Sequence, residues 1–357
     1  MIHSRFRASS PRCVPCRLAA IGAAVFALAG TFAYAAGWLT PSRLTTYRIV
    51  DQLQANSGPH PGYRRNHAKG LCVEGYFDSS GNAASISRAQ VFAPGRTPLI
   101  GRFAIPGGNP SASDASVPIR SFALLFKQHD GEQWRTGMNS TPVFAVHTPE
   151  QFYQQLVAAQ PDPQTGKPDP ARLKAFYASH PETRPFQAWV KMHPASSGLA
   201  NSTYYSINAF RFVDAGGHEH AVRWSVEPEM PYTPVDPKEK NDPDFLSEQL
   251  GKQLQHGDVR WHLIVTVANA GDPTSDATLQ WPADRERIDA GTVVLERASP
   301  QSDGACRDIN FDPTVLPDGI QTSDDPLLAA RSAAYAVSYQ RRTREEALHG
   351  APAAQQP

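Results

Sequence analysis

Alternating apolar and polar residues, interrupted by clusters of turn-forming residues, fill most of the chain and predict a series of strands. The predicted strands are 70–77, 97–104, 119–128, 141–146, 203–213, 219–227, 259–268 and 291–297. The stretch 259–268 is apolar on both faces, which indicates a well-buried strand. Gly216 and Gly217 lie between two strands, as in a hairpin turn. About eight strands at this spacing favour an antiparallel barrel or sandwich.

The pattern becomes helical at a few places. Residues 148–159 predict a helix with Thr148 as its N-cap and Pro149 at its first position. Residues 325–346 give the strongest helical signal, after a Pro- and Asp-rich coil at 299–324. Two shorter helices are predicted at 47–56 and 170–179. The chain holds 32 prolines in 357 residues, about twice the usual share. Because proline interrupts helices, this excess favours a β-rich body with long coil segments.

The N-terminus has a different pattern. Residues 18–39 are an apolar run without charge. Four arginines precede it, Arg5, Arg7, Arg12 and Arg17, and no acidic residue does. This order is typical of a signal peptide or membrane anchor and not of a buried core helix, and the run is long enough to cross a bilayer. We therefore expect a leader at 1–39, a folded domain at 40–346 and a disordered tail at 347–357. The basic flank predicts export to the periplasm, either soluble after cleavage or anchored to the inner membrane.

Charge and cysteine content narrow the possible functions. Lys and Arg number 34, as do Asp and Glu, so nothing favours binding of nucleic acid by bulk charge. The four leader arginines account for this balance, and the rest of the chain is mildly acidic. Cys13 and Cys16 lie in the leader, where we assign them no catalytic role. Cys72 and Cys306 could form a disulfide in an oxidising compartment, and the sequence leaves this open.

Three segments carry candidate chemistry. Arg331 and Tyr335 are four residues apart and share a helix face, where the guanidinium would favour the phenolate, an anionic ligand suited to ferric iron. Alone, such a pair is more typical of packing. His67 follows two arginines at the start of a strand and could be a general base, although a structural histidine is the more common case. Asn139 precedes Pro142 and could bind a small oxygen ligand or form a turn.

In combination and in chain order, these segments resemble a known family. The segments are YRRNHAKG at 63–70, GRFA at 101–104, SFALLF at 121–126, MNSTPVF at 138–144 and RSAAY at 331–335. They resemble the haem catalases, and more closely the short, often exported catalase-related peroxidases. The resemblance spans about residues 45–345. It implies a β-dominated α+β fold: an antiparallel eight-stranded catalase-type barrel, a wrapping segment and a terminal helix that bears the tyrosine.

The resemblance also implies a site. Tyr335 would be the axial ligand of the haem iron, and Arg331 would keep it anionic. His67 would move the peroxide proton and Asn139 would hold the peroxide. The remaining cofactor-binding residues would be Arg64, Arg102 and Arg342 on the propionates, and Phe152 stacked against the porphyrin. The cofactor would be haem b, held without covalent bonds because the exported part has no CxxCH motif.

Three departures from the family pattern bear on the reaction. Ala104 stands where typical catalases carry Ser or Thr beside the distal histidine, and Asn66 stands where an apolar residue is usual. The chain also ends 22 residues after Tyr335, without the C-terminal helical domain of full catalases. These departures favour a peroxidase that uses H2O2 to oxidise an unidentified organic donor, with weak or no catalase activity. The alternatives are a true catalase and an exported haem-binding barrel without activity.

A zinc hydrolase is a weaker alternative. His218 and His220 flank a glutamate, but they lack the spacing of an HExxH site. We expect them at an exposed hairpin tip.

Overall fold

The computed structural model describes residues 14–35, 38–40 and 43–349, and the chain divides into two compact units between Thr45 and Thr46. The first unit contains α1 (Val14–Ala35). Within the described residues it is the one helix long and apolar enough to cross a membrane, with a mean hydropathy of 1.9. Cys13 and the segment 350–357 lie outside the described residues.

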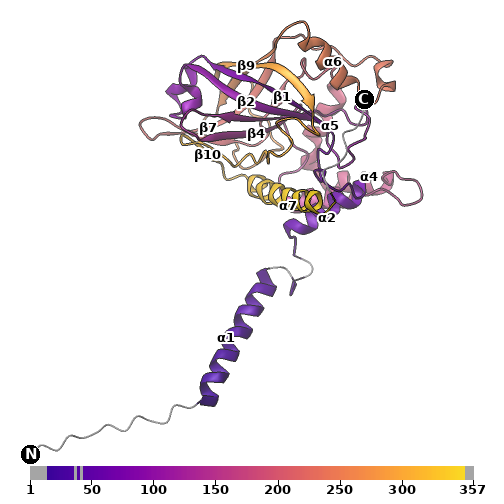
Figure 1. Ribbon diagram of the computed structural model, residues 1–357, viewed down its shortest axis with the longest axis vertical. Helices are drawn as coiled ribbons and strands as arrows, with labels where there is room; N and C mark the ends of the chain where they lie inside the picture. The colour runs from indigo at the N-terminus through magenta and orange to yellow at the C-terminus, as the bar shows by residue number, and fades with distance from the viewer. Residues whose placement is uncertain (1–13, 36–37, 41–42, 350–357) are drawn as a thin grey trace, which may run out of the picture. The chain divides into compact units, whose positions relative to one another are not determined.

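The second unit is built on a closed antiparallel barrel (Figure 1). Its eight strands are β1 (Gly70–Ser79), β2 (Gly95–Ala104), β3 (Ser121–Lys127), β4 (Gln133–Asn139), β5 (Tyr204–Tyr205), β7 (Glu219–Pro228), β8 (Val259–Val267) and β9 (Arg287–Pro300). The ring runs β7-β5-β4-β3-β2-β1-β9-β8, and pairing of β8 with β7 closes it. The fold class expected from the sequence is therefore confirmed.

Two further strands extend the barrel at one side. β6 (Phe210–Val213) and β5 pair with the same edge of β7, end to end, and β10 (Ile320–Thr322) pairs with β6. One predicted strand, 203–213, is thus two short strands with an irregular break at 206–209. Ile207 in this break has a φ of 66°, a left-handed conformation that is rare for a β-branched residue. The break turns residues 207 and 208 out of the ladder and toward the site described below.

Aromatic side chains fill the barrel. Phe103 stacks on Phe122 with ring centroids 4.1 Å apart, and Phe126 stacks on Trp134 at 4.8 Å. Each such buried side chain contributes about 1.5–3 kcal/mol through removal of apolar surface from water. Gly101 on β2 lies within this packing, because a Cβ there would meet the side chains of Val73, Leu124 and Phe122 at 2.8–3.0 Å. The close packing of the core therefore requires glycine at this position.

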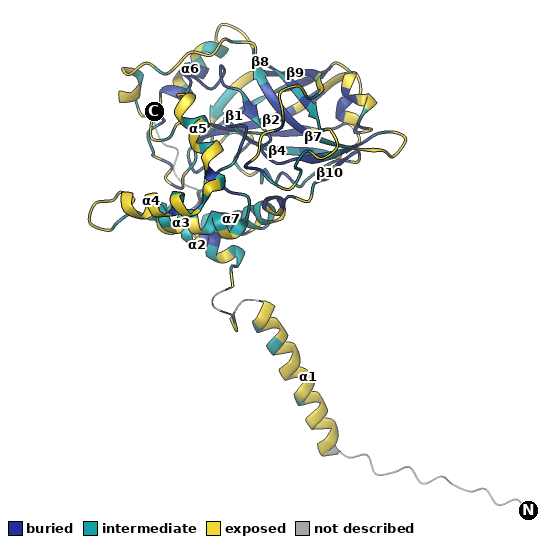
Figure 2. Ribbon diagram, turned by 180° about the vertical axis from the view of Figure 1, so that it is seen from behind, coloured by how far each residue is buried: buried dark blue, intermediate teal, exposed yellow. Residues whose placement is uncertain are grey.

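The helices of this unit are α2 (Thr46–Ser57), α3 (Pro149–Ala158), α4 (Pro170–Ser179), α5 (Arg184–Met192), α6 (Phe245–Leu254) and α7 (Pro326–His349), and the short 3-10 helices are Asn82–Ser85, Gln90–Phe92, Pro181–Thr183 and Glu239–Asn241. Helices α2, α3, α4 and α7 gather at one side of the barrel (Figures 1 and 2). α2 packs against both α3 and α7. As the sequence predicts, α3 has Thr148 as its N-cap, and the Thr148 side chain accepts a hydrogen bond from the backbone of Gln151.

Three predictions need correction. Residues 141–146 are irregular and not a strand, because Pro142 cannot donate to a ladder and the Thr141 hydroxyl donates to the Val143 carbonyl. The strand lies earlier, at β4, where buried and half-buried residues alternate. Helices α5 and α6 and strand β10 were not predicted. α7 extends to His349, three residues into the predicted tail.

A disulfide joins Cys72 on β1 to Cys306, which lies in the segment after β9. This segment follows the outside of the barrel, where Phe311 packs with Ile100 and Leu125. Arg135 on β4 donates to the Asn310 carbonyl at 2.6 Å. The segment thus wraps β2, β3 and β4 before it enters α7.

Candidate functional site

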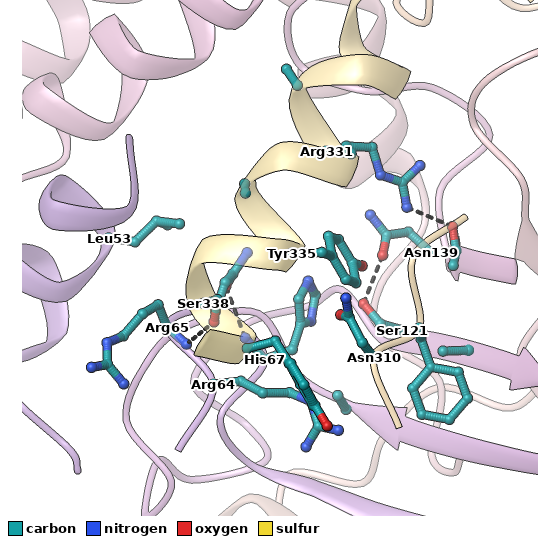
Figure 3. Close-up of a pocket in the computed structure, with 18 of the residues that line it drawn as sticks. Leu53, Arg64, Arg65, His67, Ser121, Asn139, Asn310, Arg331, Tyr335 and Ser338 are labelled. Atoms are coloured by element: carbon teal, nitrogen blue, oxygen red, sulfur yellow. Dashed lines mark hydrogen bonds between the residues drawn. The ribbon is translucent and has the colours of Figure 1, made fainter. Parts of the chain in front are cut away.

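All eight residues that the sequence nominates line one cavity between the barrel and α7. Figure 3 labels Arg64, His67, Asn139, Arg331 and Tyr335 among them. They are Arg64, His67, Arg102, Asn139, Phe152, Arg331, Tyr335 and Arg342. Between them they span most of the second unit, from the chain before β1 to the last turns of α7. The cavity walls are otherwise largely apolar, with side chains such as Leu53, Phe144 and Leu327. The barrel end and α7 together bring these distant segments to one place.

Tyr335 and Arg331 occupy one face of α7. Arg331 donates through Nη2 to the Gly137 carbonyl on β4 at 2.9 Å. A Cβ at Gly137 would lie 2.8 Å from that Nη2 and 3.5 Å from the Tyr335 hydroxyl. Glycine on β4 therefore permits the close approach of both side chains to the strand.

Asn208 holds Arg331 from the other side. Its Oδ1 accepts a hydrogen bond from Arg331 Nη1, and its Nδ2 donates to Asp325 Oδ2 at 2.7 Å. Asp325 also accepts from the backbone of Leu327 at the start of α7, and burial raises the pKa of its carboxyl. The sequence analysis missed Asn208, and its one signal was a polar side chain within an otherwise strand-like run.

His67 lies opposite, in the loop before β1. Its φ is 57°, and with Ile207 it is one of two non-glycine residues at positive φ in the described chain, both of them at this cavity. Such strained positions concentrate at functional sites. Its Nδ1 has no hydrogen-bond partner among the described residues. Removal from bulk water and then the nearby Arg102 and Arg331 lower the pKa of His67 to about 3, so the imidazole is neutral and can accept a proton.

Asn66 has a local role that the sequence did not indicate. Its Oδ1 accepts hydrogen bonds from the backbone N–H of His67, at 3.0 Å, and of Gly107, at 2.7 Å. Although Asn66 lines the cavity, its oxygen is used to hold the loop that bears His67.

Asn139 lies at the end of β4 and is oriented by Ser121 on β3. The Ser121 hydroxyl donates to Asn139 Oδ1 at 2.6 Å. Because the oxygen is occupied, the amide nitrogen is the group left to donate to a small ligand. Ser121 lines the cavity too, and the sequence analysis did not single it out.

Three guanidinium groups meet at one end of the cavity. Arg64 Nη2 donates to the carbonyls of residues 306, 307 and 309, Arg102 Nη2 to the carbonyl of His67, and Arg342 Nη1 to that of Arg307. No carboxylate forms an ion pair with any of the three among the residues that the structure describes. Burial lowers the pKa of all three, that of Arg102 to about 9, and for Arg64 and Arg102 the proximity of neighbouring arginines adds to the effect.

This arrangement fits haem. The concentrated positive charge suits a pair of carboxylates, and the Nε atoms of Arg102 and Arg342 are buried without partners in the described chain. The apolar walls suit a flat ring system, with Phe152 beside Phe144 at a centroid distance of 5.8 Å. Tyr335 supplies a phenolic oxygen of the type that binds ferric haem.

The histidine pair at 218 and 220 lies elsewhere, and both side chains contact Asp214. His218 is on the exposed turn between β6 and β7, as expected, whereas His220 is half-buried in β7. Among the described residues no group of three or more His, Cys, Asp or Glu side chains could hold a metal ion.

Comparison with known proteins agrees with this geometry. The family model described as Catalase matches residues 32–349. The chain is 35% identical over 316 residues to a catalase-related peroxidase of Synechococcus elongatus, covering 88% of this chain and 92% of that protein. It is 30% identical over 305 residues to a catalase-related peroxidase of Mycolicibacterium paratuberculosis, covering 84% and 95%. A fungal catalase structure superposes with a TM-score of 0.72 at 19% identity, and the match covers 80% of this chain and 60% of that one.

Proposed function

The chain belongs to the catalase family, and on that premise we propose that it is a haem-dependent peroxidase that uses H2O2 to oxidise an organic donor. The observation that carries the proposal is the convergence of all eight nominated residues on one cavity. Haem b, held without covalent bonds, is the proposed cofactor. When bound, it would supply iron that cleaves the O–O bond of the peroxide.

Tyr335 is the proposed iron ligand. Arg331 lies one helical turn away on the same face, and its guanidinium is held by Asn208 and by the Gly137 carbonyl. These contacts hold the Arg331 guanidinium at Gly137, where the Tyr335 hydroxyl also approaches the strand. Asn208 and Asp325 act as positioning residues for Arg331.

His67 is the proposed general base and acid. Because its pKa is lowered to about 3, it is neutral at ordinary pH and can take a proton from H2O2 and return it to the leaving oxygen. Asn139, oriented by Ser121, would donate a hydrogen bond to the peroxide from its amide nitrogen. His67 would thus transfer the proton, and Asn139 would orient the peroxide.

Arg64, Arg102 and Arg342 would bind the propionates. The carbonyls that already orient these guanidiniums pre-organise them, so little side-chain entropy is lost on binding. Phe152 would contact the porphyrin edge or face.

Peroxidase rather than catalase activity is supported by His67. Its Nδ1 has no partner in the part of the chain that the structure describes, and Ala104, which lines the same cavity, has no hydroxyl to offer. A base that is held less firmly is less effective in the second, catalase half-reaction, in which another H2O2 must give up two protons and two electrons. We infer weak catalase activity from this difference.

The apolar helix α1 supports export. We propose that the haem domain, residues 40–346, works in the periplasm, either released by leader cleavage or retained at the inner membrane.

The test is a visible spectrum of the purified protein followed by turnover assays. A high-spin ferric haem with a tyrosinate-type spectrum, H2O2-dependent oxidation of phenolic donors and slow O2 release are expected. His67→Ala should retain haem and lose turnover. A haem-free protein, or rapid O2 release comparable with a full catalase, would contradict the proposal. Haem binding without turnover in the wild type would favour the carrier alternative.

A further inference from the structure

A second cavity of about 460 Å³ adjoins the first. Arg64, Ala104 and Arg342 line both cavities. A molecule in the second cavity would therefore lie next to Arg64 and Arg342, two of the arginines proposed to bind the propionates. The volume accommodates a single-ring organic molecule.

The walls of this second cavity are suited to an aromatic ring. Phe103 and Ile105 contribute from the end of β2 and the residue that follows it, and Leu199 and Leu246 from the facing segments. All four side chains are buried, so they form a fixed apolar surface and not a mobile loop. Transfer of an apolar ring from water to such a surface is favourable.

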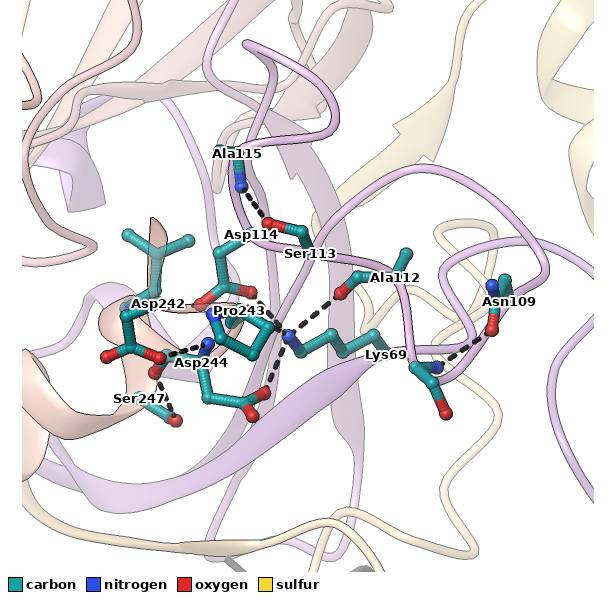
Figure 4. Close-up of polar contacts among 12 residues, drawn as sticks. Lys69, Asn109, Ala112, Ser113, Asp114, Ala115, Asp242, Pro243, Asp244 and Ser247 are labelled. Carbon is teal, nitrogen blue, oxygen red and sulfur yellow. Dashed lines mark hydrogen bonds and ion pairs between the residues drawn. The ribbon is translucent and has the colours of Figure 1, made fainter. Parts of the chain in front are cut away.

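Lys69 is not available to bind a ligand there. Its Nζ contacts Asp114 at 2.9 Å, Asp244 at 2.7 Å, and the carbonyls of Ala112 and Pro243 at 2.9 and 2.6 Å (Figure 4). An ammonium group has three hydrogens, so four oxygens occupy it fully. Arg307 is likewise engaged, by Asp308 and Glu346.

The two ends of the cavity differ in charge. Asp242 lines it and has no ion pair among the described residues, and Glu248 is exposed and has only the exposed Lys252 at 3.4 Å. These carboxylates make the solvent end negative. At the inner end Arg64 and Arg342 line the cavity, and no carboxylate forms an ion pair with either guanidinium among the described residues, so this end is positive and favours the oxygen of a phenol over an ammonium group.

From these features we propose that the second cavity is the binding site of the electron donor, and that the donor is a phenol or aromatic amine whose far end carries a positive charge. This inference rests on the proposed peroxidase function. In this reaction two donor molecules each lose one electron and one proton and leave as radicals. One H2O2 takes up both electrons and both protons and becomes two molecules of water.

The test compares two donors that share a phenol and differ in charge. Tyramine carries an ammonium group, and 3-(4-hydroxyphenyl)propionate carries a carboxylate. With the haem-loaded full chain, we expect a lower KM for tyramine. Asp242→Lys replaces a negative charge by a positive one, and it should raise the KM for tyramine about fivefold, as expected for loss of one partly screened ion pair, and should not raise that for the propionate. The KM for H2O2 should stay constant in both assays.

Two further variants complete the design. Ser302→Trp places a bulky ring at a half-buried position that lines the cavity, and it should raise the KM for both donors. Glu296→Lys makes the same charge reversal at an exposed position on β9, outside the cavity, and should change neither. If Asp242→Lys and Ser302→Trp leave both values unchanged in an active enzyme, the donor site is wrong and the peroxidase proposal stands. If the haem-loaded wild type oxidises neither donor, the peroxidase proposal itself fails.

Discussion

Arg331 on α7 donates a hydrogen bond to Asn208, which lies 123 residues earlier in the break between β5 and β6. Ser206 still bonds to Trp224 on β7, whereas residues 207 and 208 turn out of the ladder, and this departure brings the Asn208 amide to the guanidinium. The position of Arg331 is thus determined by an irregularity of the barrel as well as by the helix that bears it.

Replacement of Asn208 by Ala should therefore disturb Arg331 and Tyr335 together. The change removes hydrogen bonds to one cation and one buried carboxylate, so we expect a loss of about 2 kcal/mol in the free energy of unfolding. In the haem-loaded protein the tyrosinate bands of the visible spectrum should shift. Asn82→Ala, at an exposed site in the short 3-10 helix Asn82–Ser85 and outside the cavity lining, is the control. An unchanged spectrum for Asn208→Ala would show that Arg331 does not depend on this amide.

Ala104→Ser should give His67 a hydrogen-bonding neighbour. The hydroxyl can accept from or donate to the imidazole, which otherwise has a buried Nδ1 without a partner in the described chain. We expect O2 release from H2O2 to rise about tenfold, with little change in phenol oxidation. Ala104→Val, which adds bulk without a hydroxyl, should not produce the increase. Equal O2 release from both variants would show that catalase activity does not depend on a hydroxyl beside His67.

Loss of the Cys72–Cys306 disulfide should weaken haem binding as well as the fold. The carbonyls of residues 306, 307 and 309 hold Arg64, and that of Arg307 also holds Arg342. The double variant Cys72→Ala/Cys306→Ala frees this segment, and we expect a loss of about 4 kcal/mol in stability, typical of a long closed loop. Haem titration followed by absorbance should show lower affinity. Wild-type protein treated with a reductant should behave in the same way, and unchanged affinity in both would contradict the prediction.

The low pKa of His67 predicts how stability depends on pH. In the unfolded chain the imidazole titrates near its ordinary pKa of about 6.5, whereas in the folded chain it does so at about 3. Between these values the unfolded state binds a proton that the folded state does not, so stability falls as the pH decreases. From pH 7 to pH 4 the free energy of unfolding should fall less for His67→Gln than for wild type. The difference between the two slopes should be at most about 1.4 kcal/mol per pH unit. Chemical denaturation of the haem-free proteins measures this, and parallel pH profiles would refute it.

The sequence predicts the barrel, and it singles out residues that the fold brings to one cavity, because both leave local patterns along the chain. Strands alternate apolar and polar residues, α7 has a continuous helical pattern, and the family motifs are contiguous. Asn208 and Ser121 were missed because their roles depend on partners more than 15 residues away along the chain, and no local pattern records such contacts. The strand β4 was predicted too far along the chain, at 141–146, because Arg135 and Gly137 interrupt the alternation of apolar and polar residues in β4.

The second cavity was beyond prediction for a related reason. Phe103, Leu199 and Leu246 are ordinary core residues in sequence, and only the fold places them around a space. Lys69 belongs to a recognisable motif, yet the motif gives no hint that it joins Asp114 to Asp244.

The separation of His67 and Tyr335 has a consequence for biogenesis. One residue lies near the beginning of the folded domain and the other near its end, and the wrapping segment must circle the barrel before they can face one another. A chain that is threaded through a membrane in an extended state cannot hold the cofactor in transit, because neither half of the domain contains the complete site. If export proceeds in that way, haem has to be supplied to the chain on the far side of the membrane, after the last helix has emerged.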